Sequence, residues 1–284
     1  MAINVEAIMN GTEAALEMAN QVIYASDKTV WNPLGLELNV FVAFVLFKST
    51  AIVLLDPVVL GLCWLFGAKK LPSREPVPIM KGLEALEPKD YFFLVFNQII
   101  ESIGALYMFD AALSAPYIER DMSKITLGNT VGFVYLIFII DDFMYYFAHR
   151  IMHHPAFYAW CHKHHHRQSM PVRGYFDAAN EHPIEQVIGL VLATSSIHMA
   201  AYLSPMGGHA VGVPLFLVIY AVMALLNHTK YDVQFGFLGL GYSVRAHEMH
   251  HRFPQCNYAQ NTMIWDQILG TFKPYRGNER AKTK

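Results

Sequence analysis

Histidine is the residue type in this sequence with the clearest capacity for chemistry. Of fourteen histidines, seven lie within residues 149–166 and three more within residues 247–251. If the chain is helical there, His149 and His153 are at i and i+4 and project from the same face. The segment 162–166 and the segment 247–251 share the spacing HxxHH. Packing gives no reason for such repeats, so the pattern predicts metal binding by neutral imidazoles.

The number of imidazoles indicates more than one metal ion. A zinc ion is saturated by four ligands, and eight histidines therefore suggest two ions. Imidazole binds zinc, copper, iron and nickel alike, so the residues alone do not choose the element. His198 and His209 have no histidine partner at helical spacing and are expected to be ordinary interfacial residues. The predicted ligands are His149, His153, His162, His165, His166, His247, His250 and His251.

A second interpretation uses the same downstream segment. His247, Glu248 and His251 satisfy the HExxH pattern, in which two histidines bind zinc and the glutamate acts as a general base. An intramembrane zinc metalloprotease is therefore an alternative function. It leaves the other two histidine segments without a role, and a count of one zinc or two irons per chain separates the two hypotheses. A metal transporter or sensor, a third possibility, would need ligands at mid-membrane rather than at span ends.

The composition places these histidines in a membrane protein. Of the 284 residues, 54% are hydrophobic and only 15% are charged, against about 25% charged in soluble proteins. A net charge of -2 gives no basic field for nucleic acid, which is not an expected partner. Three dispersed cysteines, with no CxxC pair, suggest neither a disulfide framework nor a thiolate zinc site. No cleavable signal peptide is apparent in the acidic N-terminal segment.

Apolar runs of about 20 residues predict the membrane spans. Residues 38–67 contain the Asp56–Pro57 pair and form either one kinked span, which we favour, or a hairpin. In the second span Asn97, Gln98 and Glu101 share a face that should point into the bundle. The fourth and fifth spans resemble a helical hairpin. The predicted spans are residues 38–67, 91–113, 125–147, 184–203 and 209–226.

Counting spans predicts the topology. A fourth and a fifth span return the chain to the side it left, so both histidine regions share one side of the membrane. Seventeen Lys and Arg residues fall on that side and three on the other, which predicts a cytosolic histidine side. The sequence Asn10-Gly-Thr would then be a lumenal glycosylation site, unless residues 38–67 form a hairpin.

The three histidine boxes and their flanks resemble the fatty acid hydroxylase/sterol desaturase superfamily. Beyond the boxes, the resemblance includes Asp142 and Tyr146 ahead of His149-Arg150. The resemblance also includes three further motifs, and together the matching positions lie within about residues 142–275. These motifs are His182-Pro183-x-Glu185, His228-x-x-Tyr231-Asp232, and Asn257-Tyr258 through Trp265-Asp266 to Gly270-Thr271.

This resemblance implies an all-α, polytopic membrane bundle with a cytosolic histidine-rich cap that binds two irons. By position it makes the eight box histidines ligands, adds His228 as a ninth, and leaves His182 as either a ligand or a residue supporting one. His154 and His164 occupy positions that the pattern does not require. Carboxylates commonly hold the second nitrogen of a ligating imidazole. Five carboxylates are candidates for that role, with salt bridges to Arg150, Lys163, Arg245 or Arg252 as the alternative: Asp142, Glu185, Asp232, Glu248 and Asp266.

The resemblance also implies a function. The chain is expected to use dioxygen to hydroxylate or desaturate a lipid, with a sterol favoured by the short first box and the His182-Pro183 motif. A fatty acyl chain or a sphingoid base is the alternative substrate. No nucleotide-binding or haem-attachment motif is apparent, so electrons would come from a cytochrome b5-type carrier or an NAD(P)H-linked reductase. The expected location is the endoplasmic reticulum in a eukaryote and the inner membrane in a bacterium.

The sequence also divides into four parts. We expect an N-terminal segment (1–37), membrane spans (38–141), a catalytic region (142–275) that includes the last two spans, and a basic tail (276–284). Five aromatic residues near the span ends are expected to form an interfacial belt, with a lining of the substrate entrance as the alternative: Tyr145, Tyr146, Trp160, Tyr242 and Trp265.

Overall fold

A computed structural model describes residues 38–71, 86–168, 171–237 and 240–276. The N-terminal segment with its glycosylation motif and most of the basic tail lie outside the described residues. Within the described ranges the chain is mostly helical, with two short strand pairs. The prediction of an all-α, polytopic helical membrane protein is confirmed.

Among the described residues, four helices are long and apolar enough to cross a membrane. These are α2 (Leu38–Leu65), α4 (Pro88–Ser114), α5 (Phe133–Met152), which continues a π-helical turn at Gly128–Gly132, and α8 (Pro183–Leu203). α2 is one continuous helix with Pro57 inside it, so the preference for one span over a hairpin is confirmed.

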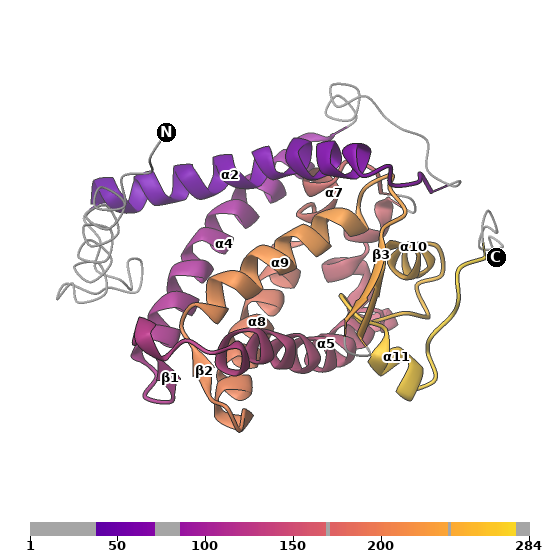
Figure 1. Ribbon diagram of the computed structural model, residues 1–284. Helices are drawn as coiled ribbons and strands as arrows, with labels where there is room; N and C mark the ends of the chain where they lie inside the picture. Colours follow the sequence, from indigo (N-terminus) through magenta and orange to yellow (C-terminus); the bar gives the residue numbers. More distant parts are fainter. Residues whose placement is uncertain (1–37, 72–85, 169–170, 238–239, 277–284) are drawn as a thin grey trace.

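The expected fifth span is shorter than predicted. α9 (Gly212–Asn227) has 16 residues, about 24 Å of helix, whereas the apolar core of a bilayer is about 30 Å thick. His209 belongs to a short strand before the helix rather than to the helix itself. α9 still returns the chain toward the end at which α8 begins, and the two histidine regions do meet there (Figure 1). However, α8 and α9 both pack on α5 rather than forming an isolated hairpin.

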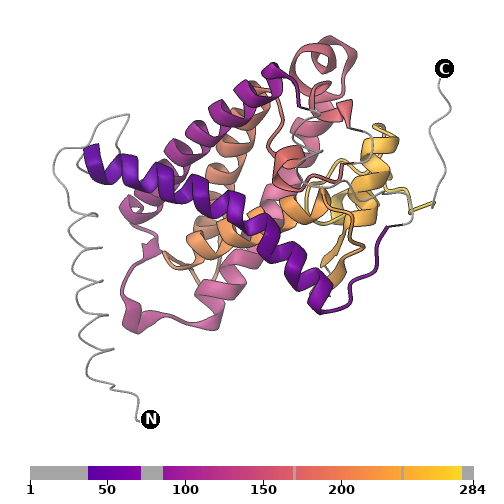
Figure 2. The same ribbon diagram turned by 90° about the horizontal axis from the view of Figure 1, so that it is seen from above.

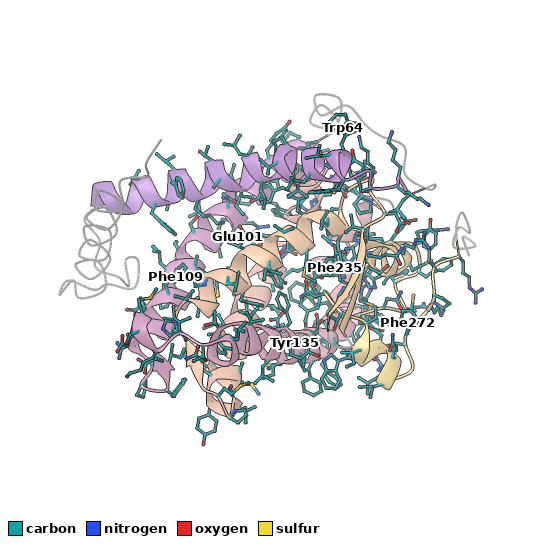
Figure 3. All side chains as sticks on the ribbon, viewed as in Figure 1. Trp64, Glu101, Phe109, Tyr135, Phe235 and Phe272 are labelled. Carbon is teal, nitrogen blue, oxygen red and sulfur yellow. The ribbon has the colours of Figure 1, made fainter. Side chains whose placement is uncertain are left out.

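α5 packs against α8 and α9, and the core between them contains Phe133, Ile137, Ile197 and Phe216, all at most 1% exposed. α2 forms an outer layer, which crosses the bundle in the view of Figure 2. Most of its apolar side chains face outward; Trp64 is 75% exposed and projects away from the other helices in Figure 3. This exposure fits a helix that faces lipid.

Polar contacts attach α2 to the bundle. Lys48 forms a 2.5 Å ion pair with Glu101 of α4. Both carboxylate oxygens of Asp56 accept the backbone N–H of Tyr175, at the start of α7 (Tyr175–Ala178). Gly174 precedes it with φ +58°, and a Cβ atom there would lie 2.5 Å from Asp56 Oδ1, so this approach requires glycine. In α4, Asn97 donates to backbone carbonyls, as the predicted inward face requires.

Short elements at one end of the bundle form the cap, on the right in Figure 1. They are α6 (Pro155–Phe157), η3 (Tyr158–His162), η4 (His165–Arg167), α7, β3 (Gln234–Phe237) antiparallel to β4 (Leu240–Ser243), α10 (Val244–Arg252) and α11 (Ile264–Ile268). At the other end, β1 (Ile118–Glu119) pairs in parallel with β2 (Gly208–His209), near η1 (Met122–Lys124).

Candidate metal centre

Nine histidines meet where the cap joins the bundle. They come from the end of α5, from η3 and η4, from the C-cap of α9 and from α10. Within each group the nitrogens that could bind an ion lie within 4.8 Å of one another. The first histidine group is His149, His153, His162, His166 and His250, and the second is His165, His228, His247 and His251.

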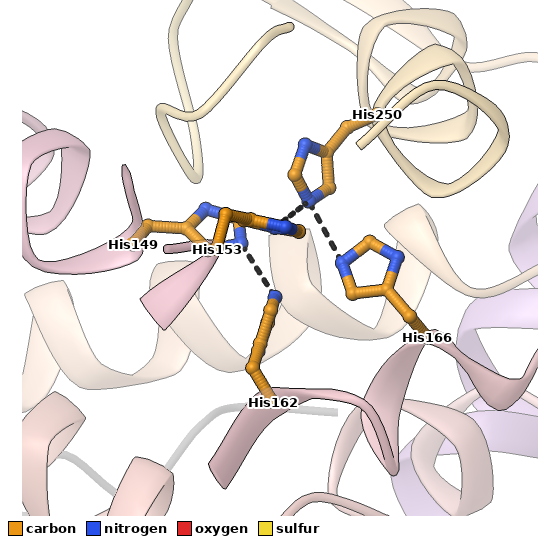
Figure 4. A group of neighbouring side chains, drawn as sticks. All are labelled: His149, His153, His162, His166 and His250. Atoms are coloured by element: carbon orange, nitrogen blue, oxygen red, sulfur yellow. Dashed lines mark hydrogen bonds between the residues drawn. The ribbon is translucent and has the colours of Figure 1, made fainter. Parts of the chain in front are cut away.

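Nε2 atoms of the first group converge on one point (Figure 4). Nε2 of His250 lies 3.1 Å from Nε2 of His153 and 3.0 Å from that of His166, and the Nε2 atoms of His149 and His162 are 2.9 Å apart. Two nitrogens at right angles about an ion, each about 2.1 Å from it, would be roughly 3.0 Å apart. These spacings are therefore those of neighbouring ligands on one ion.

The second nitrogens fix the proton positions in the first group. Nδ1 of His149 lies 2.7 Å from the carbonyl oxygen of Tyr258, and Nδ1 of His250 lies 2.8 Å from that of Cys256. A carbonyl only accepts hydrogen bonds, so both Nδ1 atoms carry the proton and both Nε2 atoms present a lone pair. Facing lone pairs at 3 Å repel each other unless a cation lies between them. The described arrangement therefore fits a metal ion.

The second histidine group has the same chemistry. Nε2 of His247 lies 3.0 Å from Nε2 of His251 and 3.3 Å from that of His228. Nδ1 of His228 donates to the carbonyl oxygen of Ala224 at 2.8 Å, and Nδ1 of His251 donates to that of Gln168 at 2.9 Å. Lone pairs again point inward. Nine neutral nitrogen donors in groups of five and four are a donor set suited to two ions.

Burial favours the neutral form of several of these imidazoles. It lowers the pKa of His250 to about 4, and burial with the neighbouring His250 and His162 lowers the pKa of His153 to about 2. The pKa of His162, His165, His166 and His251 is also well below its usual value, first because of burial and then because of adjacent histidines. A neutral imidazole is the form that binds a metal ion. These side chains can therefore bind a metal ion at neutral pH without first losing a proton.

One of the five predicted supporting carboxylates contacts a histidine of the groups directly. Glu185 Oε1 accepts from Nδ1 of His162 at 2.7 Å, and Glu185 is 3% exposed. Asp232 pairs with Arg245 at 2.5 Å and Glu248 pairs with Arg252 at 3.3 Å, which matches the salt-bridge alternative for these two.

Asp142 and Asp266 hold the segment that carries the carbonyl acceptors. Asp266 accepts from the backbone N–H groups of Tyr258 and Ala259 at 2.8 Å each, and Tyr258 is the residue whose carbonyl holds His149. Asp142 accepts from the N–H groups of Asn261 and Thr262. The two aspartates thus act on the histidines through the main chain.

The remaining histidines lie outside both groups. His182 is the N-cap of α8, where its Nδ1 accepts from the N–H of Ile184. His154 caps α6 in the same way, and His164 lies 3.0 Å from Asp90. His198 contacts Tyr117, and His209 contacts the carbonyl oxygen of Asp121, toward the β1–β2 end.

The expected aromatic belt is wrong for two residues. Tyr146 is fully buried beneath the cap, and Tyr242 is 3% exposed and donates to the carbonyl oxygen of Met223. Both are therefore core residues. Trp160 is 49% exposed, as an interfacial residue would be.

Glu181 is a residue that the sequence pattern did not single out. Glu181, Glu185 and His165 offer three potential ligand atoms within 4.8 Å of one another. Burial, and after it the charge of Glu101, raises the pKa of Glu181 to about 8. The available signal was the position of Glu181 directly before His182-Pro183 and four residues before Glu185.

The geometry agrees only in part with the alternative of a zinc metalloprotease that uses the HExxH segment. His247 and His251 do share the second group, as a zincin pair would. Glu248, however, is fully buried and pairs with Arg252 on its own helix. A general base must reach a water on the metal, whereas the Glu248 carboxylate is engaged by Arg252.

A family model described as fatty acid hydroxylase matches residues 134–271. The C-4 methylsterol oxidase of Schizosaccharomyces pombe is 28% identical over 185 residues, which cover 64% of this chain and 61% of that protein. Methylsterol monooxygenase 1 of Rattus norvegicus is 28% identical over 201 residues, covering 64% and 61%.

A probable Delta(7)-sterol 5(6)-desaturase of Neurospora crassa is 28% identical over 206 residues, covering 72% of this chain and 54% of that protein. The chain thus spans less than two thirds of the length of these curated relatives. No solved structure matches the chain.

Proposed function

Since the chain belongs to the fatty acid hydroxylase/sterol desaturase superfamily, we propose that it is a membrane-bound di-iron oxidoreductase that uses dioxygen to hydroxylate or desaturate a lipid. The observation that carries this proposal is the convergence of nine imidazoles, in groups of five and four, with their lone pairs facing inward. Iron is the element that the family favours; the donor set itself also suits zinc or copper.

The residues of this chain would hold two irons and keep the ligands in place. His149, His153, His162, His166 and His250 would bind one ion, and His165, His228, His247 and His251 the other. Bound iron would supply the activation of dioxygen against a C–H bond. Glu185 and the carbonyl groups of Tyr258 and Cys256 would orient the imidazoles through their second nitrogens.

A sterol is the substrate that we favour. The named relatives are methylsterol oxidases and a sterol desaturase. The histidine groups lie at the end of α5, one of the four helices that could span the bilayer, so a lipid could reach them from the membrane. Oxidation of a 4-methyl group and ring desaturation are the two candidate reactions. A fatty acyl chain or a sphingoid base remains the alternative substrate.

The reaction would need a partner that supplies electrons. The sequence carries no nucleotide-binding or haem-attachment motif. We therefore propose a cytochrome b5-type carrier or an NAD(P)H-linked reductase as donor. The excess of Lys and Arg on the histidine side supports a cytosolic cap, in the endoplasmic reticulum of a eukaryote or the inner membrane of a bacterium.

Purified protein, reconstituted with iron and an electron donor, tests the proposal. We expect it to oxidise a 4-methyl sterol or another ring sterol in an oxygen-dependent manner. The His165→Ala and His250→Ala variants should each lose the iron of one group and form no product. Oxidation of free acyl chains alone would move the substrate to the alternative class. Loss of product with full retention of iron in both variants would contradict the proposed ligand roles.

A further inference from the structure

Asn257 lies between the two residues whose carbonyl oxygens orient ligands of the first histidine group. The carbonyl oxygen of Cys256 accepts from Nδ1 of His250 at 2.8 Å, and that of Tyr258 accepts from Nδ1 of His149 at 2.7 Å. His149 comes from α5 and His250 from α10, so three consecutive residues hold imidazoles from two different helices. Because Asn257 separates the two carbonyl groups, its backbone torsions help to set the angle between them.

The backbone of Asn257 has a conformation that most residues avoid. Its φ is +54°, and it is the one non-glycine residue with a positive φ in the part of the chain that the structure describes. In this left-handed region the Cβ atom crowds a carbonyl oxygen, which asparagine tolerates better than most residues do. At a negative φ the Cys256 peptide would be rotated relative to the Tyr258 peptide, and at least one acceptor would turn away from its imidazole.

The side chain of Asn257 stabilises this conformation. Asn257 is 1% exposed; its Nδ2 donates to the carbonyl oxygens of Ala246 and Lys273 at 3.0 Å each, and its Oδ1 accepts from the N–H of Lys273 at 2.8 Å. The backbone N–H of Asn257 donates to the carbonyl oxygen of Thr271 at 3.2 Å. The side-chain bonds need a donor nitrogen and an acceptor oxygen, which an amide supplies and an ionised carboxylate does not. They attach residues 256–258 to α10 and to the chain that follows α11.

We propose that Asn257 is a positioning residue for the ion of the first histidine group. Its left-handed backbone and its amide together direct the carbonyl oxygens of Cys256 and Tyr258 at the imidazoles of His250 and His149. Acceptors on the second nitrogen fix the orientation of a ligating imidazole and raise its basicity. This inference rests on the metal binding in the proposed function, and it adds a residue that acts on the ion only through the main chain.

The second histidine group obtains its acceptors from other parts of the chain. His228 donates to the carbonyl oxygen of Ala224, and His251 donates to that of Gln168. Neither carbonyl belongs to residues 256–258. Substitution of Asn257 should therefore weaken the binding of one ion and spare the other, whereas a general loss of folded structure would weaken the binding of both.

Iron binding by the full-length protein, in backgrounds that retain one ion each, tests this selectivity. His251→Ala should leave the ion of the first group, and His250→Ala should leave that of the second. In the His251→Ala background we expect Asn257→Ala to lower the Fe²⁺ affinity by about 10- to 100-fold, measured by competition with a chelator. In the His250→Ala background the same substitution should leave the Fe²⁺ affinity unchanged.

Two other substitutions separate the backbone from the side chain. Asn257→Gly permits the positive φ but removes the amide, so it should lose less affinity for the first ion than Asn257→Ala does. It also keeps the test open if Asn257→Ala fails to fold. Asn257→Asp replaces the donor nitrogen by an oxygen that faces the carbonyl oxygens of Ala246 and Lys273, and it should lose affinity for the first ion although its shape is conserved.

Asn129→Ala is the matched control. Asn129 is 8% exposed and belongs to the π-helical turn that precedes α5, at the end of that helix remote from His149. Its amide also binds main-chain groups, since Oδ1 accepts from the N–H of Thr126 and Nδ2 donates to the carbonyl oxygen of Lys124, at 2.9 Å each. The control should lower the melting temperature and leave both Fe²⁺ affinities unchanged.

The outcomes separate this inference from the proposed function. Equal weakening of both ions by the Asn257 substitutions would overturn the positioning role, and so would full retention of the first ion in all three Asn257 variants of a protein that oxidises lipid. Selective weakening of the first ion in a protein that oxidises no lipid would support the positioning role and contradict the proposed oxidation. A wild type that binds no iron would overturn both.

Discussion

The boxes 162–166 and 247–251 have the same HxxHH spacing, but the fold uses them in opposite senses. In the first box the outer pair, His162 and His166, belongs to the first histidine group, and His165 belongs to the second. In the other box His247 and His251 belong to the second group, and His250 belongs to the first. Each box therefore contributes to both groups. Neither ion would be held by one segment, which explains why two similar boxes are needed.

The two boxes also differ in the groups that accept hydrogen bonds from their imidazole Nδ1 atoms. In box 162–166, Nδ1 of His162 depends on the side chain of Glu185 from α8, and the Nδ1 atoms of His165 and His166 have no hydrogen-bond partner among the described residues. In box 247–251, His250 and His251 donate to backbone carbonyls. The orientation of the first box is thus open to disruption by one side-chain substitution, whereas that of the second depends on the main chain.

The largest effect is expected from removing one ligand of each group. His250→Ala and His251→Ala change adjacent residues, but they should empty different groups, each leaving about one iron per chain and no detectable product. Metal analysis and spectroscopy of the remaining iron would show two distinct environments. His154→Ala, which changes a histidine outside both groups, should retain all the iron. Identical residual spectra from the two variants would contradict the opposite use of the boxes.

A smaller effect is expected from Glu185→Ala. Loss of the acceptor for His162 should weaken metal binding or activity by about 10- to 100-fold, the usual cost of removing such a partner. Glu185→Gln, which keeps a carbonyl oxygen, should lose less. Asp232→Asn is the control, since Asp232 pairs with Arg245 and not with a histidine. Metal affinity measured by competition with a chelator provides the comparison, and equal losses in Glu185→Ala and Asp232→Asn would show that the acceptor has no such role.

The pH dependence of the metal-free protein tests the burial of box 247–251. The pKa of His250 is about 4 in the folded chain and about 6.5 in an unfolded one. Below pH 6.5 the unfolded state therefore binds the proton first, and stability falls as the pH decreases toward 4, by an amount on the order of 3 kcal/mol for this residue. The melting temperature should be lower at pH 4.5 than at pH 7.5, and His250→Gln should reduce that difference. A flat profile would show that His250 is not buried in its neutral form.

The smallest effect is expected from Cys256→Ser. Cys256 is fully buried, but it holds His250 through its carbonyl oxygen and not through its thiol. The variant should keep two irons per chain, with a stability change within about 1–3 kcal/mol from the altered buried group. A large loss of iron would show that the thiol itself contributes to the site.

Of the five predicted spans, four are described helices long enough to cross a membrane, and the spacing predicted eight of the nine grouped histidines, because apolar length and residue type are properties of short segments. His228, the ninth, was predicted only through the family resemblance. Sequence patterns did not predict how the histidines divide. His165 and His166 are adjacent in sequence but belong to different groups, and their directions depend on how η4 packs against α10. The sequence also could not predict how Asp266 supports His149, since Asp266 binds the backbone N–H of Tyr258, whose carbonyl oxygen accepts from His149. Glu181 was missed because its position near His165 depends on where α8 begins.

Metal stoichiometry of the purified wild-type protein tests the central claim most directly. Nine imidazoles in groups of five and four predict two iron ions per chain, with loss of one group's ion after substitution of His250. A single bound zinc ion, unchanged by that substitution, would contradict the two-ion site and favour the HExxH alternative.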